Sequence, residues 1–253
     1  MAITLDSMVR NAAMSQKAGV SASTKADLAT GAFDLAGKRI GQQVDATNVQ
    51  LSAFGQVKSS YVDVQSAGNT LTTPAKISTV EDATKAVQAF ADAYNKATNV
   101  VNTAINGDGK TPGALANDLR ANLASFDLKK VVTSGTNTAD LKKIGVSVNQ
   151  DGTLAVDANA LQSAMKANLG AVQDTLARVG AQAVQISQKE LASTGSVGGS
   201  VNTLSTRAKN LAAKATEQQK LAADSQSAVL QQAGVVNNNA AGGIAAYMQM
   251  FTF

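Results

Sequence analysis

The stretch Leu141-Lys-Lys-Ile-Gly-Val-Ser-Val-Asn-Gln-Asp-Gly-Thr-Leu-Ala-Val-Asp157 decides how this chain folds. Apolar residues from Ile144 onward alternate with small or polar ones on both sides of Asn149-Gln-Asp-Gly152, which predicts a β-hairpin. Asp157 then stands where a helix N-cap belongs. The apolar residues beyond it step mostly by four and predict a helix that leaves the hairpin directly: Leu161, Met165, Leu169, Val172 and Leu176.

The composition favours helices with small side chains. Of the 253 residues only 4% are aromatic, there is no Trp, and there are two Pro. Small side chains bury little apolar surface each, at ~25 cal/mol per Å², so a thick globular core is not expected. The fold class we expect is mainly α: an elongated bundle of long coiled-coil-like N- and C-terminal helices with a small α/β knob around the hairpin.

The residue types that are missing exclude several kinds of chemistry. Cys and His are both absent, which removes thiol catalysis, disulfides and the commonest metal ligands. We therefore predict no enzyme, no cofactor and no metal site. The net charge of +4 is not clustered, which argues against nucleic-acid binding. No 18-residue apolar run predicts a membrane span, and the first residues do not resemble a secretory signal peptide.

Two long apolar stripes predict helices in the first half of the chain. The stripe from Phe33 to Tyr61 is heptad-like and contains polar Thr47 and Lys58, and the stretch from Gly68 to Pro74 is expected to end it. The second stripe follows an N-cap at Ser78-Thr79. Its core seam is expected to include Val87, Phe90, Tyr94 and Val101.

The next segments are less regular. Thr111 as N-cap with Pro112 behind it predicts a short helix through Leu115, Leu119, Leu123 and Phe126. We expect Val131-Val132 to be extended, Thr133 to Thr138 to form a loop, and a helix to continue from about Ala171 to Leu191. A Gly/Ser break at Ser193–Ser200 then precedes the last long helix.

The C-terminal helix carries the predicted assembly interface. Its stripe is small and partly polar, so it needs partners, and the chain ends in an apolar tip that a monomer would leave in water. The candidate interface residues are Leu204, Leu211, Val229, Ile244, Tyr247, Met248, Met250, Phe251 and Phe253.

Short motifs for chemistry are better explained by structure. Gly107-Asp-Gly-Lys-Thr111 lacks the first Gly of a phosphate loop, which would fall at Ala104. Asn149, Asp151 and Asp157 do not have EF-hand spacing. Adjacent acids such as Glu81-Asp82 point apart on a helix, so a carboxylate-only hydrolase would need two other carboxylates that converge in a pocket.

Three stretches in order resemble the bacterial flagellar filament-capping family, also called hook-associated protein 2. They are Leu51-Ser-Ala-Phe-Gly-Gln-Val-Lys58, then Ala86-Val-Gln-Ala-Phe-Ala-Asp-Ala-Tyr-Asn95, and the hairpin stretch with its helix to Leu176. The family carries a large, mostly β insertion between the first two, and here Leu71–Thr79 bridges them directly. The plate that would close a filament end is therefore missing.

The resemblance implies export through a flagellar-type channel and a secreted, extracellular, self-assembling axial protein. We expect four parts: an axial and secretion segment (1–36), a coiled-coil helix (37–72), the helical and hairpin knob (73–192), and the C-terminal axial helix with its tip (193–253). The expected partners are other copies of the chain, with flagellin or hook-junction proteins in second place. The alternatives are a subunit of its own homopolymeric filament or tube, and an adhesin or translocator-like binding protein.

Overall fold

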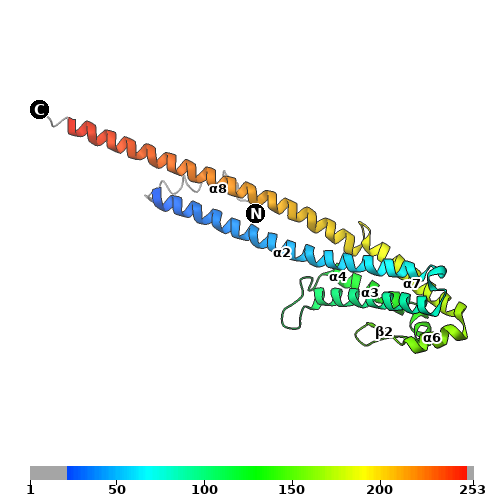
Figure 1. The fold of residues 1–253 in the computed structure, drawn as a ribbon. Helices are drawn as coiled ribbons and strands as arrows, with labels where there is room; N and C mark the ends of the chain where they lie inside the picture. The colour runs from blue at the N-terminus through cyan, green and yellow to red at the C-terminus, as the bar shows by residue number, and fades with distance from the viewer. Residues whose placement is uncertain (1–21, 250–253) are drawn as a thin grey trace. The chain divides into compact units, whose positions relative to one another are not determined.

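The computed structural model describes residues 22–249, with side chains described for residues 31–228 and 231. It is mainly α with one small antiparallel hairpin, so the predicted fold class is confirmed (Figure 1). The elements are α2 (Ala22–Leu71), η1 (Pro74–Ile77), α3 (Val80–Asn106), α4 (Leu119–Thr133), α5 (Asn137–Lys143), β1 (Val146–Val148), β2 (Leu154–Val156), α6 (Ala158–Ala167), α7 (Leu169–Leu191) and α8 (Ser196–Gln249). The chain divides into two compact units, one of residues 46–207 and one of residues 1–45 with 208–253.

The predicted hairpin and its following helix are present. Strands β1 and β2 pair antiparallel, with Val146 opposite Val156. Gly152 has φ 85°, a conformation that glycine adopts without steric cost. The Asp157 carboxylate accepts hydrogen bonds from the backbone N–H groups of Asn159 (2.9 Å) and Ala160 (3.0 Å), which makes it the N-cap of α6.

Two details of this region differ from the prediction. Ile144 is not in a strand, because it ends α5 and Gly145 after it takes φ 82°. Leu169 does not continue α6, because Asn168 breaks the helix with φ −158° and caps α7 through its side chain, which accepts from the Ala171 N–H. Leu169 therefore begins a new helix and is partly exposed.

The core of residues 46–207 is built around α3. Helix α3 packs against α4, α6, η1 and β2, while α7 packs against α4, α5 and α6. Thr79 caps α3 as predicted, since its hydroxyl oxygen accepts from the Asp82 N–H at 3.1 Å. One contiguous cluster of buried apolar side chains joins these elements.

Helix α4 was predicted wrongly. It begins at Leu119, seven residues after Pro112, and its N-cap is Asp118, whose carboxylate accepts from the N–H groups of Arg120 and Ala121. Residues 111–118 form a turn-rich connection because Asp108 holds the Thr111 N–H and hydroxyl, and the Leu115 N–H bonds back to the Ala104 carbonyl at 2.7 Å. The helix also continues through Val131 and Val132, which were expected to be extended.

Helix α2 runs through the glycine that was expected to break it. Gly68 is helical and buried, and α2 ends at Leu71. A Cβ added at Gly68 would lie 2.9 Å from the Gly180 carbonyl oxygen, and one added at Gly180 would lie 2.6 Å from the Gly68 oxygen. The two glycines therefore let α2 and α7 approach closely. The predicted apolar stripe of α2 included Lys58, but Lys58 is exposed and the neighbouring Val57 is buried instead.

The break between α7 and α8 is shorter than predicted. Helix α8 begins at Ser196, and Gly198 and Gly199 are helical. A Cβ at Gly195 would lie 2.2 Å from the Lys189 carbonyl oxygen, and one at Gly198 would lie 2.2 Å from the Ala192 oxygen, so the turn is tight.

In the other unit, burial along α8 follows a coiled-coil-like spacing. Between 208 and 228, the less exposed side chains step by four and three, while most of those between them are exposed. They include Leu211, Ala215, Gln218, Ala222 and Ser225.

Candidate functional site: assembly surfaces and a buried carboxyl pair

The predicted interface residues are placed unequally by the structure. Leu204 packs beside a small buried cluster of Phe54, Leu115 and Ala121. Leu211 is only 6% exposed within a single chain. Val229, Ile244, Tyr247 and Met248 lie in α8, but their side chains are outside the described residues, as are Met250, Phe251 and Phe253 altogether. The assembly role of all these residues stays a prediction.

The seam residues of α3 form the centre of the main core. Val87, Phe90, Tyr94 and Val101 are all buried in one cluster. The rings of Phe90 and Tyr94 are stacked with centroids 6.3 Å apart. These aromatic side chains hold the unit together and are not available to a ligand.

Asn95 connects α3 to the hairpin through a pair of hydrogen bonds. Its side-chain N–H donates to the Leu154 carbonyl at 2.8 Å, and its side-chain oxygen accepts from the Leu154 N–H at 2.6 Å. The amide thus pairs with the backbone of β2 as a neighbouring strand would. Sequence reasoning quoted Asn95 as part of a motif but gave it no role, because the motif alone does not show what its side chain contacts.

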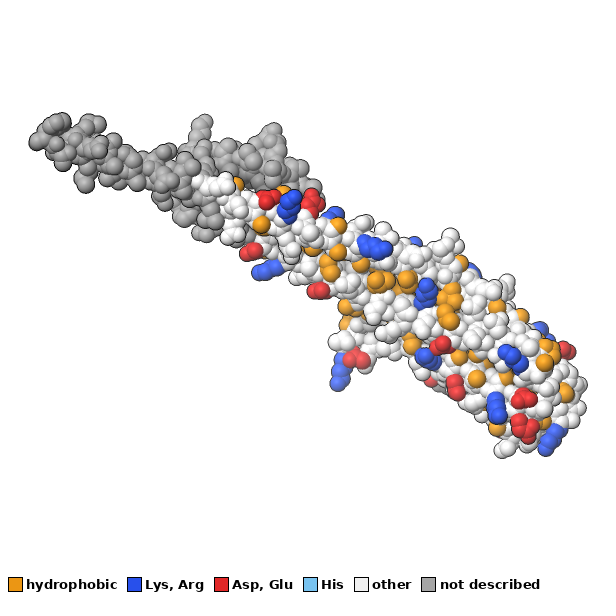
Figure 2. All heavy atoms as spheres, turned by 45° about the horizontal axis from the view of Figure 1, so that its top comes forward, with side chains coloured by type: hydrophobic (Ala, Val, Ile, Leu, Met, Phe, Trp, Pro, Cys, Tyr) orange, Lys and Arg blue, Asp and Glu red, His pale blue; other side chains and the backbone are white. Residues whose placement is uncertain are grey.

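Helix α4 carries an exposed apolar stripe. Leu119, Leu123 and Phe126 lie at steps of four and three and are 80%, 54% and 58% exposed. The ammonium of Lys130 lies 4.3 Å from the centroid of the Phe126 ring, a cation–π contact. On the face drawn in Figure 2, the Lys and Arg side chains of the described residues are interspersed with Asp and Glu side chains.

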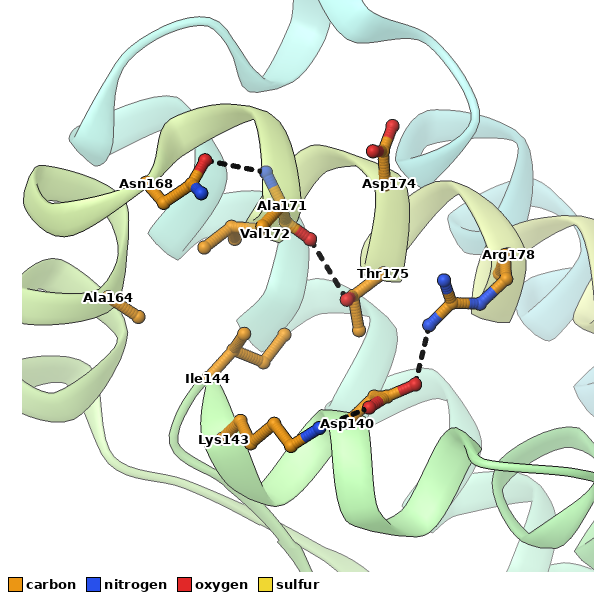
Figure 3. A pocket seen from close by; sticks show the side chains of 10 residues that line it. All are labelled: Asp140, Lys143, Ile144, Ala164, Asn168, Ala171, Val172, Asp174, Thr175 and Arg178. Atoms are coloured by element: carbon orange, nitrogen blue, oxygen red, sulfur yellow. Dashed lines mark hydrogen bonds and ion pairs between the residues drawn. The ribbon is translucent and has the colours of Figure 1, made fainter.

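An open cavity of about 360 Å³ lies between α5, α6 and α7. Figure 3 shows Asp140 and Arg178 pointing toward one another across its edge, with an ion-pair distance of 2.7 Å. Hydrogen bonds from Thr136 and Lys143 lower the pKa of Asp140, and so do the positive charges of Lys143 and Arg178. Asp140, Lys143 and Arg178 are thus paired with one another, so this edge of the cavity is a structural ion network.

Asp127 of α4 and Glu190 of α7 form a buried carboxyl pair. Asp127 receives Lys189 on one oxygen and Lys130 on the other, the latter at 3.2 Å. Burial raises the pKa of Asp127, but the bonds from the two lysines outweigh it, and the net shift is downward. Glu190 is 0% exposed, and neither of its carboxyl oxygens accepts a hydrogen bond from an N–H or O–H group.

The carboxyl pair was missed by sequence reasoning, which examined only neighbouring acids. Asp127 and Glu190 are 63 positions apart, and only the packing of α4 on α7 brings them together. They are the converging carboxylates that a hydrolase would need. However, they are closed to solvent, so no substrate can contact them in this conformation.

The motifs considered for binding have structural roles. Asp108 accepts from the Lys110 and Thr111 N–H groups, which organises the loop internally. Asp151 likewise bonds Thr153 in the hairpin turn. Among the described residues, no cluster of three or more acidic side chains is placed to hold a metal ion. Within the same residues, no helix is long and apolar enough to cross a membrane.

The comparisons with known proteins agree with this geometry. A family model described as the flagellar hook-associated protein 2 C-terminus matches residues 63–239, well over half of the chain. The match includes α3, Asn95, the hairpin and the carboxyl pair. A search of curated proteins returned no match.

Proposed function

Since this chain belongs to the flagellar hook-associated protein 2 family, a family of structural proteins of the flagellar filament cap, we propose that it is a secreted axial protein that assembles with copies of itself. The observation that carries the proposal is the match over 63–239, which covers the helical and hairpin body and most of α8. The four-part division into 1–36, 37–72, 73–192 and 193–253 belongs to the same proposal.

Local structure supports a static scaffold at the centre of this family match. The Asn95 amide and the Asp157 cap hold the hairpin, and the α3 seam is buried. The family is structural and generally without enzymatic activity. We propose that this body holds long helices in register in an axial protein.

We propose the form of the assembly from a difference between this chain and the capping family it resembles. Helix α2 ends at Leu71 and α3 begins at Val80, with only η1 between them. The β plate that the resemblance leads one to expect has no place in this connection. This favours the second candidate, a subunit of its own filament or tube, more than it favours a closing cap.

Export is part of the proposal as well. A chain without Cys forms no disulfide that would prevent passage through a narrow channel in an unfolded state. The proposed location is outside the cell, as a component of a flagellum or flagellum-like appendage. The proposed partners are other copies, and flagellin or hook-junction proteins at a junction.

The experiment that tests self-assembly removes the predicted apolar tip. Deletion of residues 244–253 is expected to abolish rings or tubes, measured by light scattering and negative-stain imaging, because Tyr247 and the two Phe residues would otherwise bury several hundred Å² at ~25 cal/mol per Å². The unfolding transition of the body should be unchanged.

A variant of full length tests whether the aromatic side chains of the tip, and not only the length of the chain, are needed for assembly. Replacing Tyr247, Phe251 and Phe253 by Ser should reproduce the deletion, whereas replacing exposed Gln219 of α8 by Ala should not. Assembly of the truncated chain at the level of the full chain would overturn the tip as interface. A full chain that stays monomeric at all concentrations would overturn the proposed function.

A further inference from the structure

The carboxyl group of Glu190 lies beside the tight turn between α7 and α8 and shares its nearest cation, Lys189, with Asp127. Glu190 is in the last turn of α7, and its side chain is wholly buried. The turn that follows Glu190 is tight, because a Cβ added at Gly195 would lie 2.6 Å from the backbone carbonyl oxygen of Glu190. An ionised carboxylate in such a place strongly destabilises the fold unless it is paired.

The nearest cation does not supply that pairing. Lys189 lies 3.8 Å from Glu190, beyond hydrogen-bond distance, and its ammonium instead contacts Asp127. Lys130 also contacts Asp127. Asp127 is therefore the ionised member of the pair, and Glu190 faces a negative charge with its own oxygens unpaired.

Neither Tyr61 nor the first turns of α8 supply a group that accepts the Glu190 proton or balances its charge. Tyr61 of α2 lies near both carboxyls, but its hydroxyl donates to the Ala124 carbonyl at 2.5 Å, and burial first and the two acids second raise its pKa far above the usual range. From Ser196 to Thr206, helix α8 brings no charged residue. The titratable and charged groups of this region are Asp127, Lys130 and Arg120 on α4, Lys189 on α7, and Tyr61 on α2.

We propose that Glu190 and Asp127 share one proton, and that this proton is a latch that keeps the α7–α8 turn closed. Glu190 carries the proton as a neutral acid and donates it toward Asp127, which keeps both of its lysine contacts. When the proton is released to solvent, the buried Glu190 carboxylate lies beside Asp127 and shares Lys189, 3.8 Å away, with it, and the turn must open to hydrate the carboxylate. The latch is independent of whether the chain assembles.

The direction of the pH dependence follows from this arrangement. Burial first, then the hydrogen bond with Asp127, raises the pKa of Glu190, and a contact with Ser196 only partly offsets the rise. A group whose pKa is raised in the closed state stabilises that state below its ordinary pKa and loses this effect as the pH rises. Between the ordinary and the raised pKa, the equilibrium constant for opening increases about tenfold per pH unit, and it then levels off.

The first test observes the proton directly. The chain has only three Glu residues, Glu81, Glu190 and Glu217. Glutamate labelled with ¹³C at the carboxyl carbon therefore gives three signals in the full chain. We expect one signal to titrate at clearly raised pH, and this signal should disappear in Glu190→Gln and persist in Glu217→Gln, a control at an exposed position. Three signals that titrate together would overturn the shared proton.

The second test observes the latch. Amide hydrogen exchange of residues 199 to 203, corrected for the intrinsic pH dependence of exchange, should accelerate about tenfold per pH unit across the titration of Glu190 in the wild type. Glu190→Gln keeps the shape and an N–H donor, so its corrected exchange should not change with pH. Equal pH dependence in both proteins would show that the proton does not hold the turn.

Discussion

Helices α3 and α4 both carry apolar residues at steps of three and four, but only α3 buries the stripe of its large side chains. On α4 the stripe of Leu119, Leu123 and Phe126 is exposed, and the buried face instead contains Ala121, Ala124, Leu128, Val131 and Val132. Small side chains let α4 lie close to α3 and α7, and the Tyr61 hydroxyl reaches the Ala124 carbonyl. Apolar periodicity thus finds a helix, but packing distance decides which face turns inward.

The largest effect is expected from truncating the buried stripe. Phe90→Ala should lower the free energy of unfolding by ~3 to 5 kcal/mol, because the ring is 3% exposed and leaves a cavity in the main core. Urea unfolding followed by circular dichroism measures the change. Phe126→Ala on α4 is the matched control and should cost less than ~0.5 kcal/mol. Equal costs for the two would remove the difference between the helices.

A smaller effect on stability is expected where the backbones of α2 and α7 are in close contact. Gly180→Ala should destabilise by ~1 to 3 kcal/mol, since the new Cβ would lie 2.6 Å from the Gly68 carbonyl oxygen, and a backbone atom cannot move aside cheaply. Gly170→Ala in the first turn of the same helix is the control, because its Cβ meets only an Asn168 oxygen at 3.7 Å. It should be neutral or gain up to ~1 kcal/mol from helix propensity. Thermal unfolding of both variants compares them, and a stable Gly180→Ala would contradict the close crossing.

The link from α3 to the hairpin gives the third prediction. Asn95→Ala should cost ~1 to 3 kcal/mol, because it leaves the Leu154 N–H and carbonyl without their partner. The amide of Leu154 should also exchange faster with solvent. Asn99→Ala, at an exposed position one turn further along α3, should change neither quantity. Unchanged protection of Leu154 in Asn95→Ala would mean that water replaces the side chain without loss.

The parts of the fold that the sequence predicted correctly are those controlled by local signals. The turn at Gly152, the caps at Thr79 and Asp157, and the α3 stripe all depend on neighbours within a few residues. The start of α4 was predicted wrongly. Pro112 is a local signal for the first position of a helix, but the hydrogen bond from the Leu115 N–H to the Ala104 carbonyl overrides it.

Long-range contacts explain why the rest of the site was not predicted. Gly68 reads as a helix breaker until Gly180 lies against it, and Lys58 occupies a heptad position that Val57 fills in the structure. The pairing of Asn95 with Leu154 and of Asp127 with Glu190 joins residues about 60 positions apart. No spacing rule in the sequence relates such residues, so the buried carboxyl pair became visible only in the fold.

The smallest effect on stability is expected on the exposed stripe of α4. The double variant Leu119→Gln and Leu123→Gln should change the free energy of unfolding by no more than ~0.5 kcal/mol, because both side chains are already in contact with solvent in the single chain. Glutamine is also a good helix former, so α4 itself should persist. Urea unfolding and light scattering should be measured on the same preparation, because they report on different surfaces. A loss of more than ~2 kcal/mol would show that the stripe is covered within the chain and that α4 is buried on both faces. Unchanged unfolding combined with lost assembly would place the stripe between copies, and would make α4 a helix with one face buried in the body and with Leu119, Leu123 and Phe126 against a neighbour.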